Sequence, residues 1–372
     1  MDKFYIVAGD IHLERQQYGL PTRFEDNLKC VNFILNEVCK NPDCRGLILT
    51  GDNFHKKAIL PKYQQLLASF YKQLTAAGKQ MMAIDGNHDG SDASWLDTIN
   101  PQLNVSDKNV LLSEKKARFY SFRLRPELYS HMGKDADSKF VFLHGRLLEL
   151  LSWAKTQASP DYDFSAKEIR DLGFKDCTFL LGDLHTYGDY HDPVANNWFI
   201  YPGSTEMTEL SEGNIISERF GDCYDTHKKV LILYPDRAVG KNWETMNLPN
   251  RPFLKRTIDK EEDIDLAISK LNEWIKNHPG GMLSLKYPQR FRANITPLLS
   301  EWKQQLLVLN DAYIAENNGK PLQEMQETDI LDIAKKELSA RQLSLLEVVL
   351  KQKEFSKEVL TLLAKPNEAI IA

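Results

Sequence analysis

Short apolar runs that stop at polar clusters recur through roughly the first 235 residues of the chain. Runs of this kind, bounded by glycine and polar residues, are typical of buried β-strands. Six of them end in such a cluster: "FYIVAGDIH" (4–12), "GLILTGDNFH" (46–55), "MMAIDGNHD" (81–89), "KFVFLHG" (139–145), "CTFLLGDLH" (177–185) and "WFIYPGS" (198–204). A seventh run, "KVLILYPD" (229–236), ends without one. We predict a strand for each run.

Helical patterns lie between the first three runs. The segment "FEDNLKCVNFILNEVCK" (24–40) spaces its apolar residues by three and four, as an amphipathic helix does. The segment "PKYQQLLASFYKQLTAAG" (61–78) starts with proline and ends at glycine, which marks helix ends. Strands that alternate with helices predict βαβ units, and the later, more closely spaced strands predict a second sheet. An α/β fold with two sheets face to face and helices outside suits this order.

The composition changes near residue 240. A strand within 247–259, an amphipathic helix over 261–278 and a strand over 282–288 predict a small α+β module. From about residue 294 the chain is charged and reads as helical over 295–319 and 340–365. We predict three domains, which are 1–240, 241–293 and 294–372.

Composition narrows the class of protein. Of the 372 residues, 42% are hydrophobic and 27% charged, as in ordinary globular domains. The five cysteines form no CxxC pair, which favours reduced thiols in the cytosol. We see no signal peptide and no stretch of the ~18 apolar residues that a membrane span needs. The net charge of -5 means that any nucleic-acid surface is local or shared with a partner.

The polar clusters share one position, directly after a predicted strand. They contain Asp10, His12, Asp52, His55, Asn87, His88, His144, Asp183 and His185. The carboxyl ends of parallel strands meet at one edge of an α/β sheet, where ligands bind. A single aspartate after a strand is also common in plain turns, so Asp10 alone carries little weight. Recurrence after several strands predicts one shared site.

The residue types indicate a metal site. Histidine, aspartate and asparagine without thiolates favour Mn²⁺, Fe²⁺ or Zn²⁺ over a structural zinc. Asp10 and His12 are two residues apart, so on an extended strand both face one ion. The two oxygens of Asp52 can bridge two cations. Two metals about 3.5–4 Å apart suit hydrolysis of a phosphate ester. The glycines before Asp10, Asp52, Asn87 and Asp183 are expected to allow sharp turns.

The series "GDIH", "GDNFH", "DGNHDG", "FLHGR" and "GDLH" resembles the motifs of the calcineurin-like metallophosphoesterases. Two segments point to one branch. "GDNFHKK" (51–57) and "YPGSTEMTELSEG" (201–213) are similar to elements of the SbcD-type DNA-repair nucleases. The resemblance implies a four-layer α-β-β-α sandwich with a small α+β cap domain and C-terminal helices. The resemblance is strong to about residue 213 and looser beyond it.

The resemblance also implies a role for each site residue. One metal would be held by Asp10, His12, Asp52 and His185, and the second by Asp52, Asn87 and His144. His88 would not be a ligand but a general acid, or would stabilise the transition state. His55 would support phosphate positioning. The metals would be two divalent ions, most of all Mn²⁺, with Mg²⁺, Fe²⁺ or Zn²⁺ as alternatives.

One position departs from the family pattern. The family usually has GHxH where this chain has Gly182-Asp183-Leu184-His185. Asp183 therefore stands where a histidine normally binds the second metal. Its carboxylate can ligate there, or it can hydrogen-bond just outside the metal shell. Asp89, the last residue of "GNHD", is expected to orient its neighbours.

Basic residues and the C-terminal segment suggest partners. Arg146 follows His144 and could touch phosphate or form a surface ion pair. Arg290 and Arg292 lie in "LKYPQRFRANI" (285–295), a patch that could contact DNA backbone or be a solvated edge, as could "ARFYSFRLRP" (117–126). An apolar stripe over 343–355 could cover the chain's own core or dock on a partner coiled coil. The resemblance implies the SbcC-like SMC/ABC ATPase as that partner.

These observations favour a metal-dependent nuclease that cleaves phosphodiester bonds at double-strand DNA ends, in DNA repair or recombination. The resemblance implies exonuclease action and allows endonuclease action, by a homodimer within a heterotetramer. The expected location is the cytoplasm of a bacterial or phage-infected cell. Two alternatives remain, a metallophosphoesterase of small substrates and a DNA-end-binding scaffold without catalysis.

Overall fold

The structure is a computed structural model that describes residues 2–90, 94–121, 132–151, 162–208, 227–258 and 262–314. Its contacts divide the chain into two units, Met1–Lys255 and Arg256–Ala372. Short 3-10 turns occur at Gln17–Gly19, Gly133–Asp135, Leu148–Leu150 and Gln289–Phe291. Within the described ranges, no helix combines the length and the apolar character that crossing a membrane requires.

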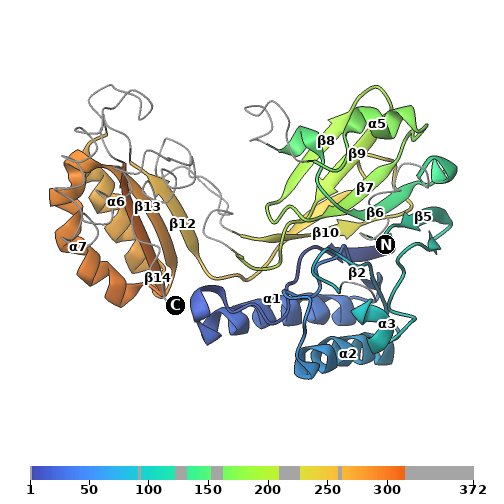
Figure 1. Ribbon diagram of the computed structural model, residues 1–372, viewed down its shortest axis with the longest axis horizontal. Coiled ribbons are helices and arrows are strands. Elements are labelled where there is room, and N and C mark those ends of the chain that lie inside the picture. Colours follow the sequence, from blue (N-terminus) through green and yellow to red (C-terminus); the bar gives the residue numbers. More distant parts are fainter. Residues whose placement is uncertain are drawn as a thin grey trace, which may run out of the picture. The chain divides into compact units, whose positions relative to one another are not determined.

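The first sheet of unit 1 has five strands. Their order is β11 (Trp243–Asn247), β10 (Lys229–Leu233), β1 (Phe4–Ala8), β2 (Cys44–Leu49) and β3 (Gln80–Ala83). β1, β2 and β3 are parallel, and β10 runs antiparallel to β1. The outer face of this sheet carries α1 (Pro21–Lys40), α2 (Pro61–Ala76) and α3 (Trp95–Ile99) (Figure 1). The βαβ units expected from the alternating pattern are confirmed.

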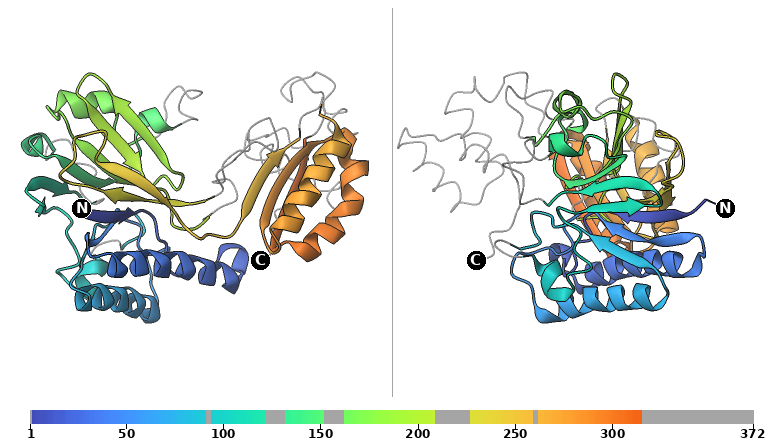
Figure 2. Two further views of the ribbon diagram at one scale, coloured as in Figure 1. Left: turned by 180° about the vertical axis from the view of Figure 1, so that it is seen from behind. Right: turned by 90° about the vertical axis from the view of Figure 1, so that its right-hand side faces the viewer.

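The second sheet of unit 1 has six strands. Their order is β4 (Asn109–Leu112), β5 (Lys115–Phe119), β6 (Phe140–His144), β7 (Thr178–Gly182), β9 (Asn197–Tyr201) and β8 (Gly188–Asp192). The four inner strands are parallel, and the two edge strands are antiparallel to their neighbours. The outer face carries α5 (Ala166–Asp171), which Figure 1 labels and Figure 2 shows from further sides.

Three apolar cores separate four layers. Successive side chains of a strand point to opposite faces, so Ile6 of β1 packs with Ile34 of α1 while Val7 faces the other sheet. Val7 shares its core with Phe142 of β6. A third core joins the far face of the second sheet to Ile169 of α5. The expected four-layer α-β-β-α sandwich is confirmed.

Unit 2 is a small α+β module. Its sheet has the order β12 (Phe253–Thr257), β13 (Met282–Pro288) and β14 (Val308–Ile314), and β12 begins just before the unit boundary. α6 (Ile264–Asn277) and α7 (Arg292–Gln305) lie on one face of this sheet (Figure 1). α6 packs through Leu271, Trp274 and Ile275, as its apolar spacing predicts.

The unit boundaries differ from the expected 240 and 293. Residues 243–247 form β11, which pairs with β10 and so belongs to unit 1. Residues 308–314, expected to be helical, form β14 parallel to β13. Short apolar runs fit a helix or a strand equally, and pairing with β13 decides here. The apolar stripe over 343–355 lies outside the described residues.

Candidate metal and phosphoesterase site

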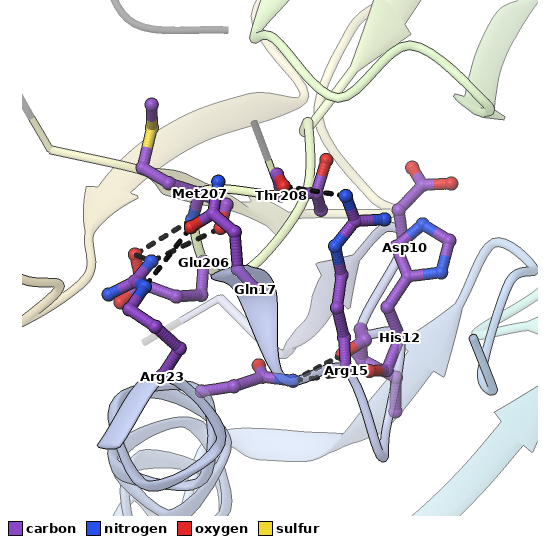
Figure 3. Close-up of a pocket in the computed structure, with 10 residues that line it drawn as sticks. Asp10, His12, Arg15, Gln17, Arg23, Glu206, Met207 and Thr208 are labelled. Carbon is purple, nitrogen blue, oxygen red and sulfur yellow. Dashed lines mark hydrogen bonds and ion pairs between the residues drawn. The ribbon is translucent and has the colours of Figure 1, made fainter. Parts of the chain in front are cut away.

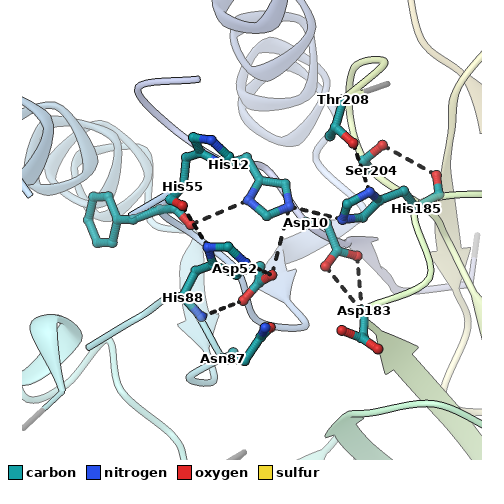
Figure 4. A network of polar contacts seen from close by, with 12 residues as sticks. Asp10, His12, Asp52, His55, Asn87, His88, Asp183, His185, Ser204 and Thr208 are labelled. Carbon is teal, nitrogen blue, oxygen red and sulfur yellow. Dashed lines mark hydrogen bonds and ion pairs between the residues drawn. The ribbon is translucent and has the colours of Figure 1, made fainter. Parts of the chain in front are cut away.

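The predicted ligands converge at one edge of unit 1. Strands β1, β2 and β3 of the first sheet and β6 and β7 of the second end there, and each carries its candidate ligands at or shortly after its last residue. Figure 4 shows the side chains that it labels from the two sheets pointing toward one another. The residues brought together are Asp10, His12, Asp52, Asn87, His144, Asp183 and His185, with His55 and His88 beside them.

The loops after β1 and β2 are joined by backbone hydrogen bonds. The His12 amide donates to the Asp52 carbonyl at 2.9 Å, and the His55 amide donates to the Leu13 carbonyl at 3.2 Å. β1 ends at Ala8, and Asp10 has a φ of 40°. Our reason for pairing Asp10 with His12, an extended strand, is therefore wrong. A left-handed loop turns both side chains inward instead.

Four candidate ligands have positive φ, namely Asp10 and His12 at 40°, Asp52 at 49° and Asp183 at 94°. The left-handed region is unfavourable for residues with a Cβ, by about 1–3 kcal/mol in strained cases. Such strain persists only where the surrounding structure enforces it, and it concentrates at functional sites. At these four residues the backbone adopts an unfavourable conformation that places the side chains in the cluster.

The glycines before the ligands do not all serve as expected. Of the four, only Gly51 has a positive φ, of 101°. At Gly86 an added Cβ would lie 2.2 Å from the Asp52 amide nitrogen and Oδ1. At Gly182 it would lie 2.2 Å from the Thr50 carbonyl oxygen. These two glycines permit close approach of strand ends rather than turns.

Asp52 lies at the centre of the cluster. Its Oδ2 is 3.8 Å from His12 Nε2, and its Oδ1 is 3.5 Å from His144 Nε2. The side chain is almost fully buried, with 3% exposed. The two oxygens thus face different imidazoles, which is the arrangement that a bridging carboxylate needs.

The hydrogen bonds around the cluster fix the histidine tautomers. His144 Nδ1 donates to the Thr50 carbonyl at 3.0 Å, and His12 Nδ1 lies 3.4 Å from the Phe54 carbonyl. Because a carbonyl oxygen only accepts, these contacts keep the proton on Nδ1. Nε2 of His12 and Nε2 of His144 then point into the cluster, as in metal-ligating histidines.

Acceptor atoms face one another inside the cluster. His12 Nε2 and His185 Nε2 are 3.0 Å apart. The Asn87 amide lies 3.0 and 3.1 Å from the two Asp52 oxygens and 3.0 Å from His144 Nε2. An amide nitrogen there would donate to Asp52, whereas an amide oxygen would need a cation between them. Ligand atoms of Asp10, His12, Asp52 and His185 all lie within 4.8 Å of one another. The residues present fit divalent cations.

The electrostatics agree with this fit. Burial raises the pKa of Asp10 to about 6, and it lowers the pKa of His12 well below the usual value. Burial also opposes a charge on His144, but the surrounding carboxylates, first that of Asp52, raise its pKa to about 9. Buried carboxylates of this kind attract a positive charge, and a proton or a metal can supply it.

Asp183 lies at the rim of the cluster. Its Oδ1 is 3.8 Å from His144 Nε2, and its Oδ2 is 3.4 Å from Arg146 Nε. Its amide donates to the Asp10 carboxylate at 3.1 and 3.3 Å. Arg146 also lies 3.9 Å from Asp163. One oxygen of Asp183 can therefore join a metal shell while the other stays with the guanidinium.

His88 and His55 are stacked beside Asp52. Their ring centroids are 5.8 Å apart, at an interplanar angle of 11°. The His88 amide donates to Asp52 Oδ1 at 3.0 Å, and its Nδ1 lies 2.6 Å from the His55 carbonyl. The His88 side chain is 36% exposed, so substrate can reach it. Burial lowers the pKa of His55 to about 4.

Asp89 orients its neighbours, as expected for the last residue of "GNHD". Its carboxylate accepts from the backbone amides of Asn53, Phe54 and Gly86 at 2.8–3.1 Å and from the Asn53 side chain at 2.8 Å. Burial, reinforced by Asp52, raises the pKa of Asp89 to about 7. Asp89 thereby ties the loop after β2 to the loop after β3.

Sequence reasoning missed several residues that support the site. Thr208 Oγ1 lies 2.8 Å from His185 Nδ1, and Arg15 contacts both Thr208 and His55. Arg23, only 2% exposed, pairs with Glu206 at 3.0 Å and so anchors the segment that carries Thr208 (Figure 3). The only signal for this segment was the family-like stretch 201–213, of which 209–213 lie outside the described residues.

The candidate DNA-contacting arginines of unit 2 lie on its surface. Arg290 is in the 3-10 turn Gln289–Phe291, and Arg292 begins α7. Both are exposed, and the Arg290 guanidinium lies 4.7 Å from the centre of the Phe291 ring. Of the other basic patch, 117–126, the part beyond residue 121 lies outside the described residues.

A two-sheet sandwich with a His/Asp/Asn cluster at its strand ends defines a metallophosphoesterase-like protein. The chain belongs to the calcineurin-like phosphoesterase family, whose sequence profile matches residues 5–203. The expected superfamily is thereby confirmed.

Two curated relatives share a name. The DNA double-strand break repair protein Mre11 of Halobacterium salinarum is 27% identical over 219 residues, which are 56% of this chain and 53% of the relative. The protein of the same name from Methanosarcina acetivorans is 23% identical over 291 residues, 75% of this chain and 44% of the relative. The chain thus spans about half the length of the curated relatives it matches.

Proposed function

We propose that the protein is a metal-dependent nuclease that hydrolyses phosphodiester bonds at double-strand DNA ends. The observation that carries this proposal is the convergence of candidate ligands on both oxygens of Asp52, with a partly exposed His88 beside them. A two-metal cluster and an adjacent imidazole are the parts that phosphodiester hydrolysis needs.

Each residue has a proposed role. Asp10, His12 and His185 hold one divalent ion together with Asp52. Asn87 and His144 hold the second with Asp52, and Asp183 adds a carboxylate there. When bound, the ions lower the pKa of a water molecule and neutralise charge on the phosphate.

His88 and His55 act on the substrate in this proposal. His88 delivers a proton to the leaving oxygen through Nε2, because its Nδ1 is committed to the His55 carbonyl. His55 hydrogen-bonds a phosphate oxygen. Both rings make edge contacts with the His12 ring, which help to hold their orientation.

The relatives support DNA as the substrate, because both are named for double-strand break repair. We infer the SbcD-type branch from the motifs described above, with exonuclease action first and endonuclease action as a second mode. Mn²⁺ is the proposed native ion, since the mixed oxygen and nitrogen donors suit it. Unit 2, through Arg290 and Arg292, and Arg146 of unit 1 are proposed to contact DNA phosphates.

The proposed assembly is a homodimer bound to an SbcC-like SMC/ABC ATPase, as a heterotetramer in the cytoplasm. The partner-binding segment would follow β14, within residues 315–372. This assignment rests on the apolar stripe over 343–355, whose spacing suits a partner coiled coil.

The direct test uses end-labelled duplex DNA with Mn²⁺, with and without EDTA. We expect metal-dependent degradation from the ends. His88→Ala should lower kcat about 10²–10⁴-fold, as expected for loss of a general acid. The matched control is His191→Ala, since His191 lies in β8 and bonds Asn196 instead of the cluster. It should leave kcat unchanged.

The other outcomes separate the alternatives. Hydrolysis of chromogenic phosphodiesters without any cleavage of DNA would favour a small-substrate phosphoesterase. DNA binding without Mn²⁺-dependent cleavage would favour a non-catalytic scaffold. Full cleavage by His88→Ala would remove the proposed role of His88 but leave the metal cluster intact.

A further inference from the structure

Arg15 links His55, beside the cluster, to Thr208, which contacts the candidate ligand His185. It lies in the loop between β1 and α1, and Figure 3 shows it beside His12 and reaching Thr208. Its Nη2 donates to the Thr208 carbonyl at 2.6 Å, and its Nη1 lies 3.4 Å from His55 Nδ1. Thr208 in turn contacts His185 Nδ1 through its hydroxyl at 2.8 Å.

The chemistry of the guanidinium restricts His55. Arginine stays protonated in proteins and only donates hydrogen bonds. A ring nitrogen that faces it must therefore present a lone pair. Contact with Arg15 Nη1 leaves His55 Nδ1 bare and puts the ring proton on Nε2. The bond to Thr208 holds the guanidinium in place, because one edge of its rigid fork is already committed.

His88 has the opposite arrangement. Its Nδ1 lies 2.6 Å from the His55 carbonyl, so that nitrogen carries a proton and Nε2 is the ring nitrogen left to face the substrate. The stacked rings of His55 and His88 thus differ in which nitrogen can donate. In the proposed function, His88 Nε2 is the atom that transfers the proton to the leaving oxygen. An Nε2–H that cannot easily lose its proton suits a fixed donor to an anionic oxygen.

We propose that Arg15 is a positioning residue that holds His55 in the Nε2–H tautomer, so that His55 donates a hydrogen bond to the substrate phosphate. This inference rests on the proposed phosphodiesterase function. It separates the two stacked histidines into a fixed donor, His55, and a proton-transfer group, His88. It also gives a role to an arginine that belongs to none of the motifs.

The test combines a spectroscopic and a kinetic readout. In protein labelled with ¹⁵N-histidine and loaded with diamagnetic Mg²⁺, the nitrogen resonances of His55 should show a bare Nδ1 and a protonated Nε2. In Arg15→Gln the His55 tautomer should become mixed. KM for bis(p-nitrophenyl) phosphate with Mn²⁺ should then rise about tenfold with little change in kcat, since a bond made in both ground and transition state is lost.

Arg15→Lys is the conservative variant. The lysine ammonium can hydrogen-bond to Thr208 or to His55 but not to both at once. KM of Arg15→Lys should therefore lie between the KM values of the wild type and Arg15→Gln. Metal affinity should stay unchanged in both variants. A loss of metal affinity with an unchanged His55 tautomer would overturn the inference, because Arg15 would then act through Thr208 and His185.

The wild-type nitrogen spectrum tests the proposed Nε2–H tautomer of His55 even if the variants do not fold. A proton on His55 Nδ1 would overturn the inference outright, and so would an unchanged KM and tautomer in Arg15→Gln. If the chain hydrolyses no phosphodiester at all, the proposed function fails, while the tautomer still reports whether Arg15 sets His55.

Discussion

Asp52 shows at the scale of single residues how this site is specified. Its positive φ and its burial both work against an aspartate at that position. The surroundings nevertheless enforce it, through the His88 amide on one side and the imidazoles of His12 and His144 around it. A carboxylate held at such a cost in energy is best explained by the cations it can bridge.

Asp183 offers a residue-scale test of metal preference. In Asp183→His a nitrogen donor replaces a harder carboxylate oxygen next to His144. We expect the preference for Zn²⁺ over Mn²⁺ to rise on the order of tenfold, because imidazole favours zinc. Competition titrations measure it. The control Asp189→His, on an exposed position of β8, should change nothing. An unaltered metal preference in Asp183→His would mean that Asp183 pairs with Arg146 and does not bind the metal.

At the scale of elements, the strand ends position the ligands through contacts that tolerate no side chain. Gly182 ends β7 against the Thr50 carbonyl, and that carbonyl is also the acceptor for His144 Nδ1. The end of one strand therefore fixes both the position of its neighbour and the tautomer of a ligand. A side chain added at Gly182 should therefore lower both the stability of the fold and the affinity for metal.

Gly182→Ala tests that contact. The new Cβ would lie 2.2 Å from the Thr50 oxygen and 2.5 Å from His144 Nδ1, neither of which can move freely. We expect the free energy of unfolding to fall by roughly 1–3 kcal/mol, with weaker metal binding. Gly188→Ala is the control, since its nearest neighbour, a Leu150 methyl, is 3.7 Å away. Chemical denaturation compares the two. Equal free energies of unfolding for the two variants would show that the end of β7 can shift to accommodate the added methyl group.

Much of the arrangement of strands and helices could be predicted from the sequence. Strands that end in ligands, helices between them and a two-sheet α/β fold follow from apolar periodicity and from the rule that parallel strands end at one edge. The left-handed conformation of Asp10 and His12 could not be predicted, because it depends on backbone bonds between distant loops. The same holds for β14, whose apolar run becomes a strand only by pairing with β13.

The residues that orient the candidate ligands His185 and His55 could not be predicted from the sequence either. Arg15 and Thr208 lie 193 residues apart and meet through one hydrogen bond. Their residue types carry no ligand signal, and nothing in their spacing relates them. Motif matching found the groups that would touch the metals, and it found Asp89, but it did not find Arg15 or Thr208.

For the molecule as a whole, metal binding and stability should be linked through Asp10. Its folded pKa of about 6 lies above the ordinary value of 3.8. Protonation of Asp10 therefore favours the metal-free fold at low pH, and this contribution is lost as the pH rises through 6. Below that range Mn²⁺ must displace this proton, so Mn²⁺ binding weakens as the pH falls.

The midpoint of thermal unfolding should accordingly respond to Mn²⁺ in a pH-dependent way. We expect a clear rise on adding Mn²⁺ at pH 7 and a much smaller rise at pH 5, measured by scanning calorimetry. In Asp10→Asn the Mn²⁺ effect should be lost at both pH values. Equal Mn²⁺ effects at pH 5 and pH 7 in the wild type would contradict the link to Asp10.

Anomalous diffraction from crystals soaked in Mn²⁺ tests the central claim most directly. The account predicts two peaks, one on each side of the Asp52 carboxylate and about 3.5–4 Å apart. The first should lie among Asp10, His12 and His185, and the second beside Asn87 and His144. A single peak, or peaks that do not touch Asp52, would contradict the two-metal site on which the proposed function depends.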